Sequence, residues 1–192
     1  MAIDTPTLHL VRHAPPTQDP VRPAREWDLA VEAAAAVAEL RASGVLPTEA
    51  SWVSSPEPKA RATAALLTDA VVRVDDDLRE AFRSAAYVDA DVFERCALHS
   101  FADPNASAAP GWEPLVRTRA RMLRAARAAV VSGGGGDVVL VGHGTSLTML
   151  VAALPASRPD VPAWRAMRMP DHCAIRWPDE LVAPWGSWRR VT

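Results

Sequence analysis

The sequence predicts an α/β protein with a mostly parallel sheet, because segments typical of strands and of helices alternate along it. Short runs rich in β-branched residues alternate with longer segments rich in Ala, Leu and Arg along most of the 192 residues. This alternation is typical of strand–helix units in a parallel sheet. Apolar residues make up 49% of the chain and charged residues 23%, so it can bury a hydrophobic core. No repeat or long linker divides it, and we expect a single domain over residues 1–192.

The N-terminal part of the chain is expected to contribute three strands and two helices. Residues 7–11 are typical of a short buried strand. The prolines at positions 15, 16, 20 and 23 predict a loop, because proline fixes φ and lacks an N–H donor. An Ala-rich helix is predicted over residues 28–43 with Gly44 at its end. A strand over 51–54, a helix over 57–70 with proline in its first turn, and a strand over 71–74 follow.

The C-terminal part continues the alternation after a weaker middle segment. Residues 82–110 predict a short helix around 89–98 within irregular loop. A long helix is predicted over 112–131, then a glycine connection at 133–136, a strand at 137–141 and a helix at 145–154. Residues 174–177 and 187–191 are interpreted as edge strands. Four arginines of the long helix recur every three or four residues and predict a solvated face with Leu123 and Ala126 turned inward: Arg117, Arg121, Arg124 and Arg127.

Composition excludes or disfavours several classes of protein. The net charge of -2 and the pI near 6.2 disfavour a nucleic-acid binder. No apolar run approaches the roughly 20 residues of a membrane helix, and no secretory signal is visible at the N-terminus. Two isolated cysteines, Cys96 and Cys173, form neither a disulfide framework nor a Cys-x-x-Cys metal motif. We expect a cytoplasmic protein with no nucleic-acid partner, no membrane partner and no metal site.

Chemically versatile side chains follow the predicted strands where each strand ends. Arg12 and His13 come directly after the first strand, and His143 lies between two glycines after the strand at 137–141. The carboxyl ends of parallel strands meet at one edge of a sheet, where such sheets bind ligands. We therefore expect both histidines at the same edge. The sequence 54–56 (Ser-Ser-Pro) ends another strand there, and 78–80 (Leu-Arg-Glu) follows the next.

These motifs together resemble those of the histidine phosphatase superfamily, also called the phosphoglycerate-mutase-like family. Residues 12–14 are similar to its Arg-His-Gly motif, and residues 141–144 are similar to its closing Gly-His-Gly motif. Residues 54–60 with Thr63-Ala64 are similar to its Ser-Ser-Pro-x-x-Arg-Ala motif, and residues 78–80 to its Leu-x-Glu motif. The resemblance covers about residues 7–155 and implies a three-layer sandwich with helices on both faces of the sheet. Two positions depart from the family pattern, Ala14 for glycine and Lys59 for arginine. Lysine is a point charge that cannot grip phosphate through a planar fork.

The resemblance implies a role for each matched residue. His13 attacks phosphorus and becomes phosphohistidine, as suits a neutral imidazole near pH 7. Glu80 is the general acid for the leaving oxygen and then helps water to attack. Neither a metal nor another cofactor is required, because arginine and lysine supply positive charge. The expected ligands of the phosphate group, or of a sulfate ion in its place, are Arg12, Lys59, His143 and the backbone N–H groups that begin the helix at Gly144.

These expectations favour a phosphatase that hydrolyses a small phosphorylated metabolite. A phosphoglycerate mutase-type transferase is the alternative; the chain is short between Glu80 and Trp112, where such mutases carry further substrate-binding segments. A phosphohistidine-protein phosphatase is a third enzymatic interpretation. The alternative outside catalysis is a phospholigand-binding module of low activity that kept the pocket, which Ala14 and Lys59 would support.

Overall fold

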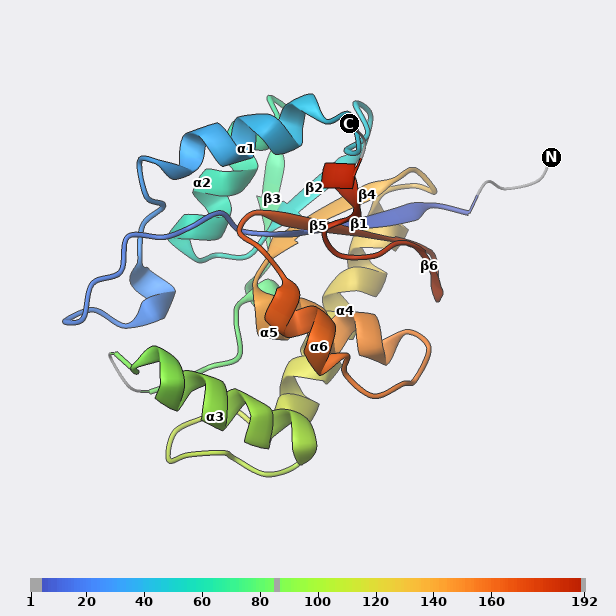
Figure 1. Ribbon diagram of the computed structural model, residues 1–192. Helices are drawn as coiled ribbons and strands as arrows, with labels where there is room; N and C mark the ends of the chain where they lie inside the picture. The colour runs from blue at the N-terminus through green and yellow to red at the C-terminus, as the bar shows by residue number, and fades with distance from the viewer. Residues whose placement is uncertain (1–4, 85–86, 191–192) are drawn as a thin grey trace.

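The computed structural model describes residues 5–84 and 87–190, and its elements alternate largely as the sequence predicts. Within these residues one six-stranded sheet has the order β3-β2-β4-β1-β5-β6 (Figure 1). Strands β1 (Thr7–Arg12), β2 (Ser51–Ser54), β3 (Val72–Val74) and β4 (Val138–Gly142) are parallel. Strands β5 (Asp171–Arg176) and β6 (Glu180–Ala183) continue the sheet in antiparallel pairing. The predicted α/β class with a mostly parallel sheet is confirmed, although β6 was not predicted.

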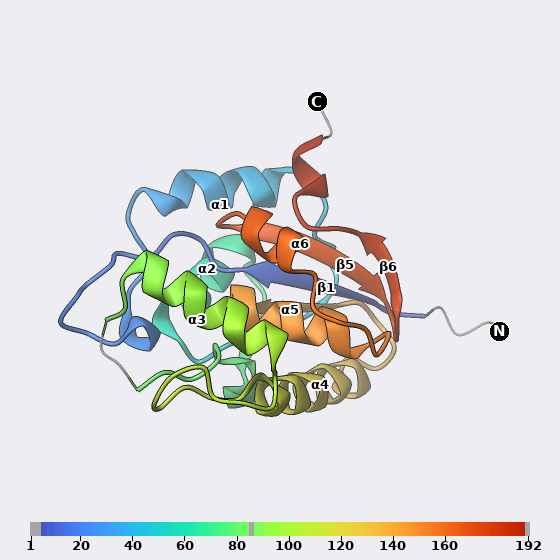
Figure 2. The same cartoon turned by 60° about the horizontal axis from the view of Figure 1, so that its bottom comes forward.

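Helices cover both faces of the sheet, as Figures 1 and 2 show. Helices α1 (Ala33–Ala42) and α2 (Pro58–Leu67) pack on one face, and α4 (Leu115–Ser132) and α5 (Gly144–Ala153) on the other. Side chains alternate along a strand, so Leu8 and Leu10 join the core under α4 and α5 while Val11 joins the core under α1 and α2. Strand β4 is buried along its whole length, as a central strand covered on both faces must be.

Helices α3 (Ala90–Ala102) and α6 (Val161–Ala166) lie outside these two layers. A third core cluster joins them to the body of the protein, because Phe101 of α3 packs with Leu115 and Met149 and contacts Trp164 of α6. Figure 2 shows α3 crossing in front of α5. Helix α6 was not predicted. Within the described part of the chain, no helix has the length and apolarity needed to cross a membrane.

Two predicted elements differ most from the structure in their extent or type. Helix α1 begins at Ala33 and not at residue 28, because residues 28–30 instead pair with the proline-rich loop: Thr17 N–H donates to Asp28 O and Ala30 N–H to Pro15 O, both at 2.9 Å. The expected edge strand at 187–191 is, over its described residues, a short 3-10 helix, η3 (Ser187–Arg190). The buried carboxylate of Asp171 holds this turn by accepting from Gly186 N–H and Trp188 Nε1.

The prediction that the arginines of the long helix are exposed to solvent is wrong for Arg121. Arg121 is 3% exposed, whereas Arg117, Arg124 and Arg127 are exposed as predicted. The guanidinium of Arg121 donates to both carboxylate oxygens of Glu113, at 3.2 and 3.0 Å. It also donates to three backbone carbonyl oxygens, those of Asp77, Arg79 and Glu80, at 2.6–3.0 Å. Arg121 therefore fixes the segment that carries the predicted acid Glu80.

Candidate active site

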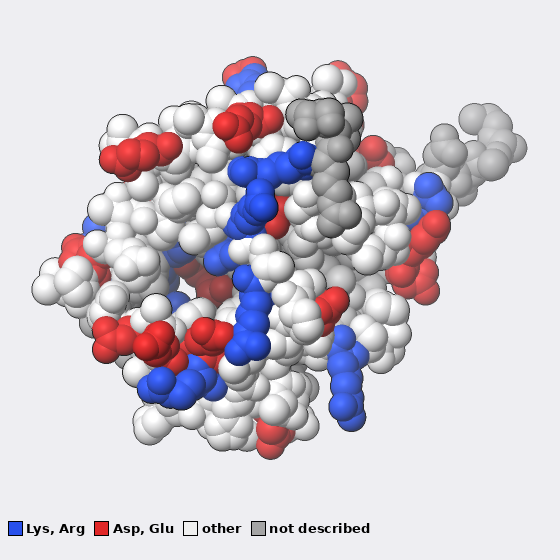
Figure 3. Space-filling view, viewed as in Figure 1, with Lys and Arg blue, Asp and Glu red and all other residues white. Residues whose placement is uncertain are grey.

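A cleft of about 540 Å³ opens at the carboxyl edge of the parallel strands. Figure 3 shows this face hollowed, with acidic and basic side chains inside the hollow. The structure brings the side chains predicted from the motifs to this one cleft, from the ends of β1, β4 and the segment after η2 (Asp76–Leu78) and from the start of α2. They are Arg12, His13, Lys59, Glu80 and His143. Gly144 follows His143 and begins α5.

The ring of His13 is held in one orientation and is neutral at neutral pH. Its Nδ1 lies 2.7 Å from the carbonyl oxygen of Ala14. A carbonyl oxygen can only accept, so Nδ1 carries the hydrogen and Nε2 keeps its lone pair. Burial lowers the pKa of His13 well below its usual value, and nearby His143 and Lys59 lower it further. His13 therefore presents an unprotonated nitrogen at pH 7, as a nucleophile must.

The alanine that replaces the motif glycine fits without backbone strain. Ala14 is fully buried, and its N–H donates to Thr63 Oγ1 at 3.0 Å. Thr63 Oγ1 in turn donates to Lys59 O at 2.7 Å. Among the described residues, Ala156 is the only non-glycine residue with positive φ, so Ala14 has a backbone conformation open to any L residue. Ala14 thus leaves the position of His13 undisturbed.

His143 faces His13 across the cleft floor, and its buried Nδ1 has no hydrogen-bond partner among the described residues. The two ring centroids are 5.1 Å apart, with an angle of 61° between the ring planes. Burial lowers the pKa of His143 to about 3, so its ring is neutral. Its Nε2 lies 2.7 Å from Ser55 Oγ. We assign the hydroxyl as donor in this contact, so Nδ1 carries the hydrogen; this buried nitrogen has no partner among the described residues. A bound oxyanion would supply the missing acceptor.

Arg12 has a second unused donor at the same place. Its Nη1 donates to Met167 O at 2.7 Å, while its buried Nε has no partner in the described part of the chain. A Cβ on Gly144 would stand 3.3 Å from Nε, so glycine at this position gives the guanidinium room. Arginine stays charged in proteins, and its planar fork binds two oxygens of a carboxylate or phosphate group. Arg12 and His143 together leave two buried N–H groups for an anion.

Glu80 is engaged at the N-terminus of α5 in this structure. Its carboxylate accepts from Thr145 N–H at 3.1 Å and from Ser146 N–H at 2.8 Å. It also accepts from Ala81 N–H at 2.8 Å. Negative charge is favourable at a helix N-terminus, so this contact stabilises α5. The N–H groups after Gly144 that were expected to bind phosphate therefore already hold a carboxylate, and phosphate binding at Gly144 itself stays a prediction.

Lys59 is buried and paired with a carboxylate that the sequence analysis missed. Its Nζ donates to Glu57 Oε2 at 2.5 Å and to Ala24 O at 2.7 Å. Glu57 Oε1 accepts from Glu80 N–H at 2.8 Å and lies 3.5 Å from His143 Nε2. Glu57 lies inside the Ser54–Ala60 motif. The signal that could have revealed it is its position there, two residues from the chain's only lysine.

The outer part of the cleft is aromatic. The rings that line it come from the proline-rich loop, the segment after Glu80 and helix α3, and they are Trp27, Phe82, Tyr87 and Phe93. The Arg25 guanidinium lies 5.6 Å from the centre of the Phe82 ring, and that of Arg83 lies 4.6 Å from the Phe93 ring. Such rings bind apolar or planar surfaces, and arginines stacked on them keep their charge at the rim.

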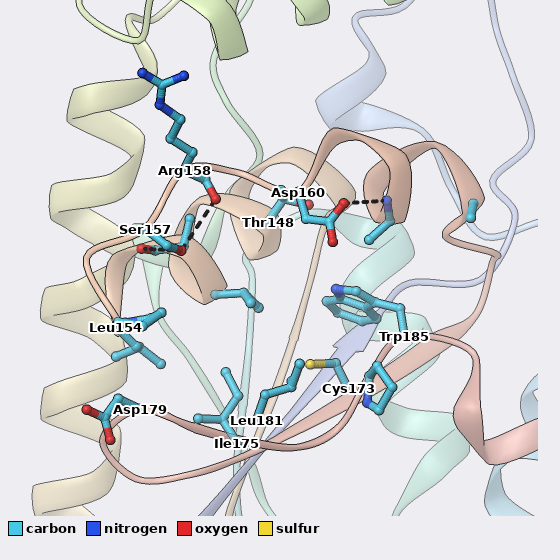
Figure 4. A pocket seen from close by; sticks show the side chains of 16 residues that line it. Thr148, Leu154, Ser157, Arg158, Asp160, Cys173, Ile175, Asp179, Leu181 and Trp185 are labelled. Atoms are coloured by element: carbon cyan, nitrogen blue, oxygen red, sulfur yellow. Dashed lines mark hydrogen bonds between the residues drawn. The ribbon is translucent and has the colours of Figure 1, made fainter.

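A second cavity, of about 280 Å³, lies between α5, α6 and the antiparallel strands (Figure 4). Its wall is mostly apolar and includes Leu154, Ile175 and Leu181. Burial raises the pKa of the Cys173 thiol there to about 12, so the thiol stays protonated and unreactive. None of the motif residues lines this cavity, and the cleft is the candidate active site. The described residues contain no group of three or more His, Cys, Asp or Glu that could hold a metal ion.

The fold and its two facing histidines define a protein of the phosphoglycerate-mutase-like class. The chain belongs to the histidine phosphatase superfamily (branch 1), whose family model matches residues 8–179. The resemblance seen in the motifs is thus confirmed. A search of curated proteins finds no match.

Solved structures of bacterial proteins are similar over most of the chain. The native mycobacterial glucosyl-3-phosphoglycerate phosphatase is 26% identical with a TM-score of 0.69, over 94% of this chain and 95% of that one. YhfR of Bacillus stearothermophilus is 18% identical with a TM-score of 0.72, over 92% and 95%. Phosphoglycerate mutase from Thermus thermophilus is 24% identical with a TM-score of 0.63, over 93% and 97%. The last two show the fold alone, whereas the superfamily and the phosphatase indicate phosphatase or mutase activity.

The buried histidines predict a loss of stability in acid. Burial lowers the pKa values of His143 and His172 to about 3, while unfolded histidine titrates near 6.5. As the pH falls, these histidines therefore take up protons in the unfolded chain before they do so in the folded protein. The free energy of unfolding is unaffected by them above pH 6.5 and decreases as the pH drops toward 3. At pH 4.5 each of these histidines should cost roughly 2–3 kcal/mol.

Urea unfolding at pH 7.5 and 4.5 measures this loss. His172→Gln should lose less stability between the two pH values than the wild type, by roughly 2 kcal/mol. His99→Gln, at an exposed position in α3, should lose as much as the wild type. An equal loss in all three proteins would contradict the assignment to buried histidine.

Proposed function

We propose that this protein is a metal-independent phosphatase that hydrolyses a phosphomonoester through phosphohistidine at His13. The observation that carries the proposal is the orientation of His13, whose Nδ1 is committed to Ala14 O in a cleft shared with Arg12 and His143. The superfamily and the mycobacterial phosphatase named above support a hydrolytic reaction. Cytoplasmic location remains part of the proposal.

The residues of the cleft suit a two-step reaction. In the first step His13 Nε2 bonds to phosphorus, the ester P–O bond breaks, and the leaving oxygen takes a proton from Glu80. In the second step Glu80 takes a proton from water, water oxygen bonds to phosphorus, and the P–N bond breaks to release phosphate. Arg12 and His143 Nδ1–H hold the phosphate oxygens, and each such donor is worth about 3 kcal/mol.

The size and lining of the cleft support a substrate larger than phosphate itself. A phosphate or sulfate ion would occupy only the floor of the 540 Å³ cleft. The rings of Trp27, Phe82 and Tyr87 at the outer part favour a phosphorylated metabolite whose leaving group offers an apolar or planar surface. A panel of phosphorylated metabolites would identify it.

The test of the proposal is hydrolysis of para-nitrophenyl phosphate by the wild-type protein in excess chelator. Turnover that is unaffected by the chelator supports a metal-independent phosphatase. Phosphate binding without turnover would support the second candidate, a low-activity phospholigand-binding module. The contacts that favour the module are those of Lys59 with Glu57 and of Glu80 with α5, since both side chains are engaged before any ligand binds. Transfer of the phosphoryl group to a second hydroxyl compound in place of water would favour a mutase.

The acid role of Glu80 predicts an effect that depends on the leaving group. Nitrophenolate leaves without a proton, whereas an alkoxide needs one. Glu80→Gln should therefore slow hydrolysis of an alkyl phosphate roughly 10²-fold or more, and hydrolysis of para-nitrophenyl phosphate far less. Because Glu80 also caps α5, the melting temperature of the variant is measured beside its rates. Equal slowing of both esters would assign Glu80 a positioning role.

A further inference from the structure

Glu57 places a buried negative charge on the floor of the proposed phosphate site. Its side chain is 7% exposed, and both carboxylate oxygens are held, Oε2 by Lys59 Nζ at 2.5 Å and Oε1 by Glu80 N–H at 2.8 Å. It lines the same cleft as His13 and Arg12. Like charges repel more strongly in a buried site than in water, so this carboxylate opposes any anion that enters.

The predicted charged site residues of the cleft, Arg12, Lys59 and Glu80, have balanced formal charges with Glu57 before a ligand arrives. Two cations, Arg12 and Lys59, meet two carboxylates, Glu57 and Glu80. The two histidines are neutral, because burial lowers the pKa values of both. Of the two carboxylates, Glu80 is committed to the backbone of α5, whereas Glu57 is paired directly with Lys59. A phosphate that takes Lys59 as a ligand must therefore share or displace the carboxylate that already holds it.

We propose that Glu57 sets the anion affinity of the cleft by competing with phosphate for Lys59. Dianions then bind weakly, and inorganic phosphate, the product of hydrolysis, leaves readily. The carbonyl oxygen of Ala24 keeps Lys59 in place when the Glu57 contact is lost, because it accepts from the same ammonium at 2.7 Å. The inference rests on the proposed phosphate site but not on turnover.

Calorimetric titration of the full chain with inorganic phosphate tests this competition without any catalytic step. Glu57→Gln keeps the size of the side chain and an oxygen for Glu80 N–H but removes the charge. The dissociation constant of phosphate should fall at least tenfold. Glu57→Asp keeps the charge and should not tighten binding. Unchanged or weaker binding by Glu57→Gln, or tightening by Glu57→Asp to the same degree, would overturn the proposal.

Glu26 provides a matched control in the same cleft. Its side chain is 48% exposed and lies 3.3 Å from Arg25 Nη2 at the outer part. Water screens an exposed charge, so Glu26→Gln should change the phosphate dissociation constant less than about twofold. Tightening equal to that of Glu57→Gln would show a general effect of net charge and would overturn the specific role of Glu57.

Two tetrahedral oxyanions of different charge extend the test to the unmodified protein. Tungstate carries two negative charges and perrhenate one. The wild type should bind tungstate less than about tenfold more tightly than perrhenate, and Glu57→Gln should raise this preference at least tenfold. A wild-type preference above about a hundredfold would overturn the proposal even if Glu57→Gln did not fold. If the wild type showed these binding preferences but did not hydrolyse phosphomonoesters, the proposed function would be contradicted. The role of Glu57 in anion binding would still hold.

Discussion

His13→Ala is expected to lower kcat for para-nitrophenyl phosphate about 10⁴-fold or more. The other catalytic groups assist only the reaction through the covalent intermediate. Without the nucleophile this intermediate cannot form, so most of the rate enhancement is lost. The phosphate site should survive, because Arg12 and His143 do not hydrogen-bond to His13 in the structure. Phosphate binding by the variant should thus remain within a few-fold of the wild type while turnover is lost.

A matched histidine separates this effect from general damage. His99 is exposed in α3 and lies outside the cleft, so His99→Ala should retain wild-type turnover. Wild-type protein quenched during turnover should carry a phosphoryl group that is labile in acid and stable in alkali, and His13→Ala should carry none. Equal rates for the wild type and His13→Ala would end the phosphohistidine mechanism.

The sequence predicted the position of the cleft because that position follows from topology. Parallel strands place their carboxyl ends at one edge, so residues after β1 and β4 had to meet there despite their separation along the chain. Topology alone brings His13 and His143 together at this edge, without any side-chain contact. It does not determine which atoms of each ring are free.

What the sequence could not predict depends on contacts between distant segments. Nothing local distinguishes Arg121 from Arg124, because both follow the same helical spacing; only Glu113 and the carbonyl groups after β3 select Arg121 for burial. The commitment of Glu80 to α5 likewise depends on residues 65 and 66 positions away. Residues 187–190 contain tryptophan and arginine that suit a strand, yet the buried carboxylate of Asp171 turns them into a helix.

Arg121→Met is expected to destabilise the protein by about 3–5 kcal/mol, which is the cost of leaving a buried partner charge uncompensated. The variant removes the cation that faces Glu113 at 3.0 Å, and that carboxylate is only 10% exposed. Burial alone raises the pKa of Glu113, but the hydrogen bonds from Arg121 and Phe82 N–H lower it below its usual value. Without Arg121 the ionised form loses its main support, and three carbonyl oxygens lose a donor as well.

Arg124→Met isolates burial as the cause of this difference. Arg124 lies on the same helix and pairs with Asp77 at 3.0 Å, but its side chain is 65% exposed. Exposed pairs contribute only about 0–1 kcal/mol, so Arg124→Met should unfold at nearly the wild-type urea concentration. Similar destabilisation by both variants would contradict the central role of Arg121.

The position of Arg121 also connects stability to chemistry. Its guanidinium binds the carbonyl groups of Asp77, Arg79 and Glu80, so it fixes the short segment between β3 and the acid. If Glu80 is the proton donor, Arg121→Met should slow hydrolysis of an alkyl phosphate more than hydrolysis of para-nitrophenyl phosphate, as is expected for Glu80→Gln. The rates are measured at a low temperature at which the variant is still folded. A purely structural arginine would slow both esters equally. The ratio of the two rates therefore distinguishes a positioning residue from a residue that only holds the fold together.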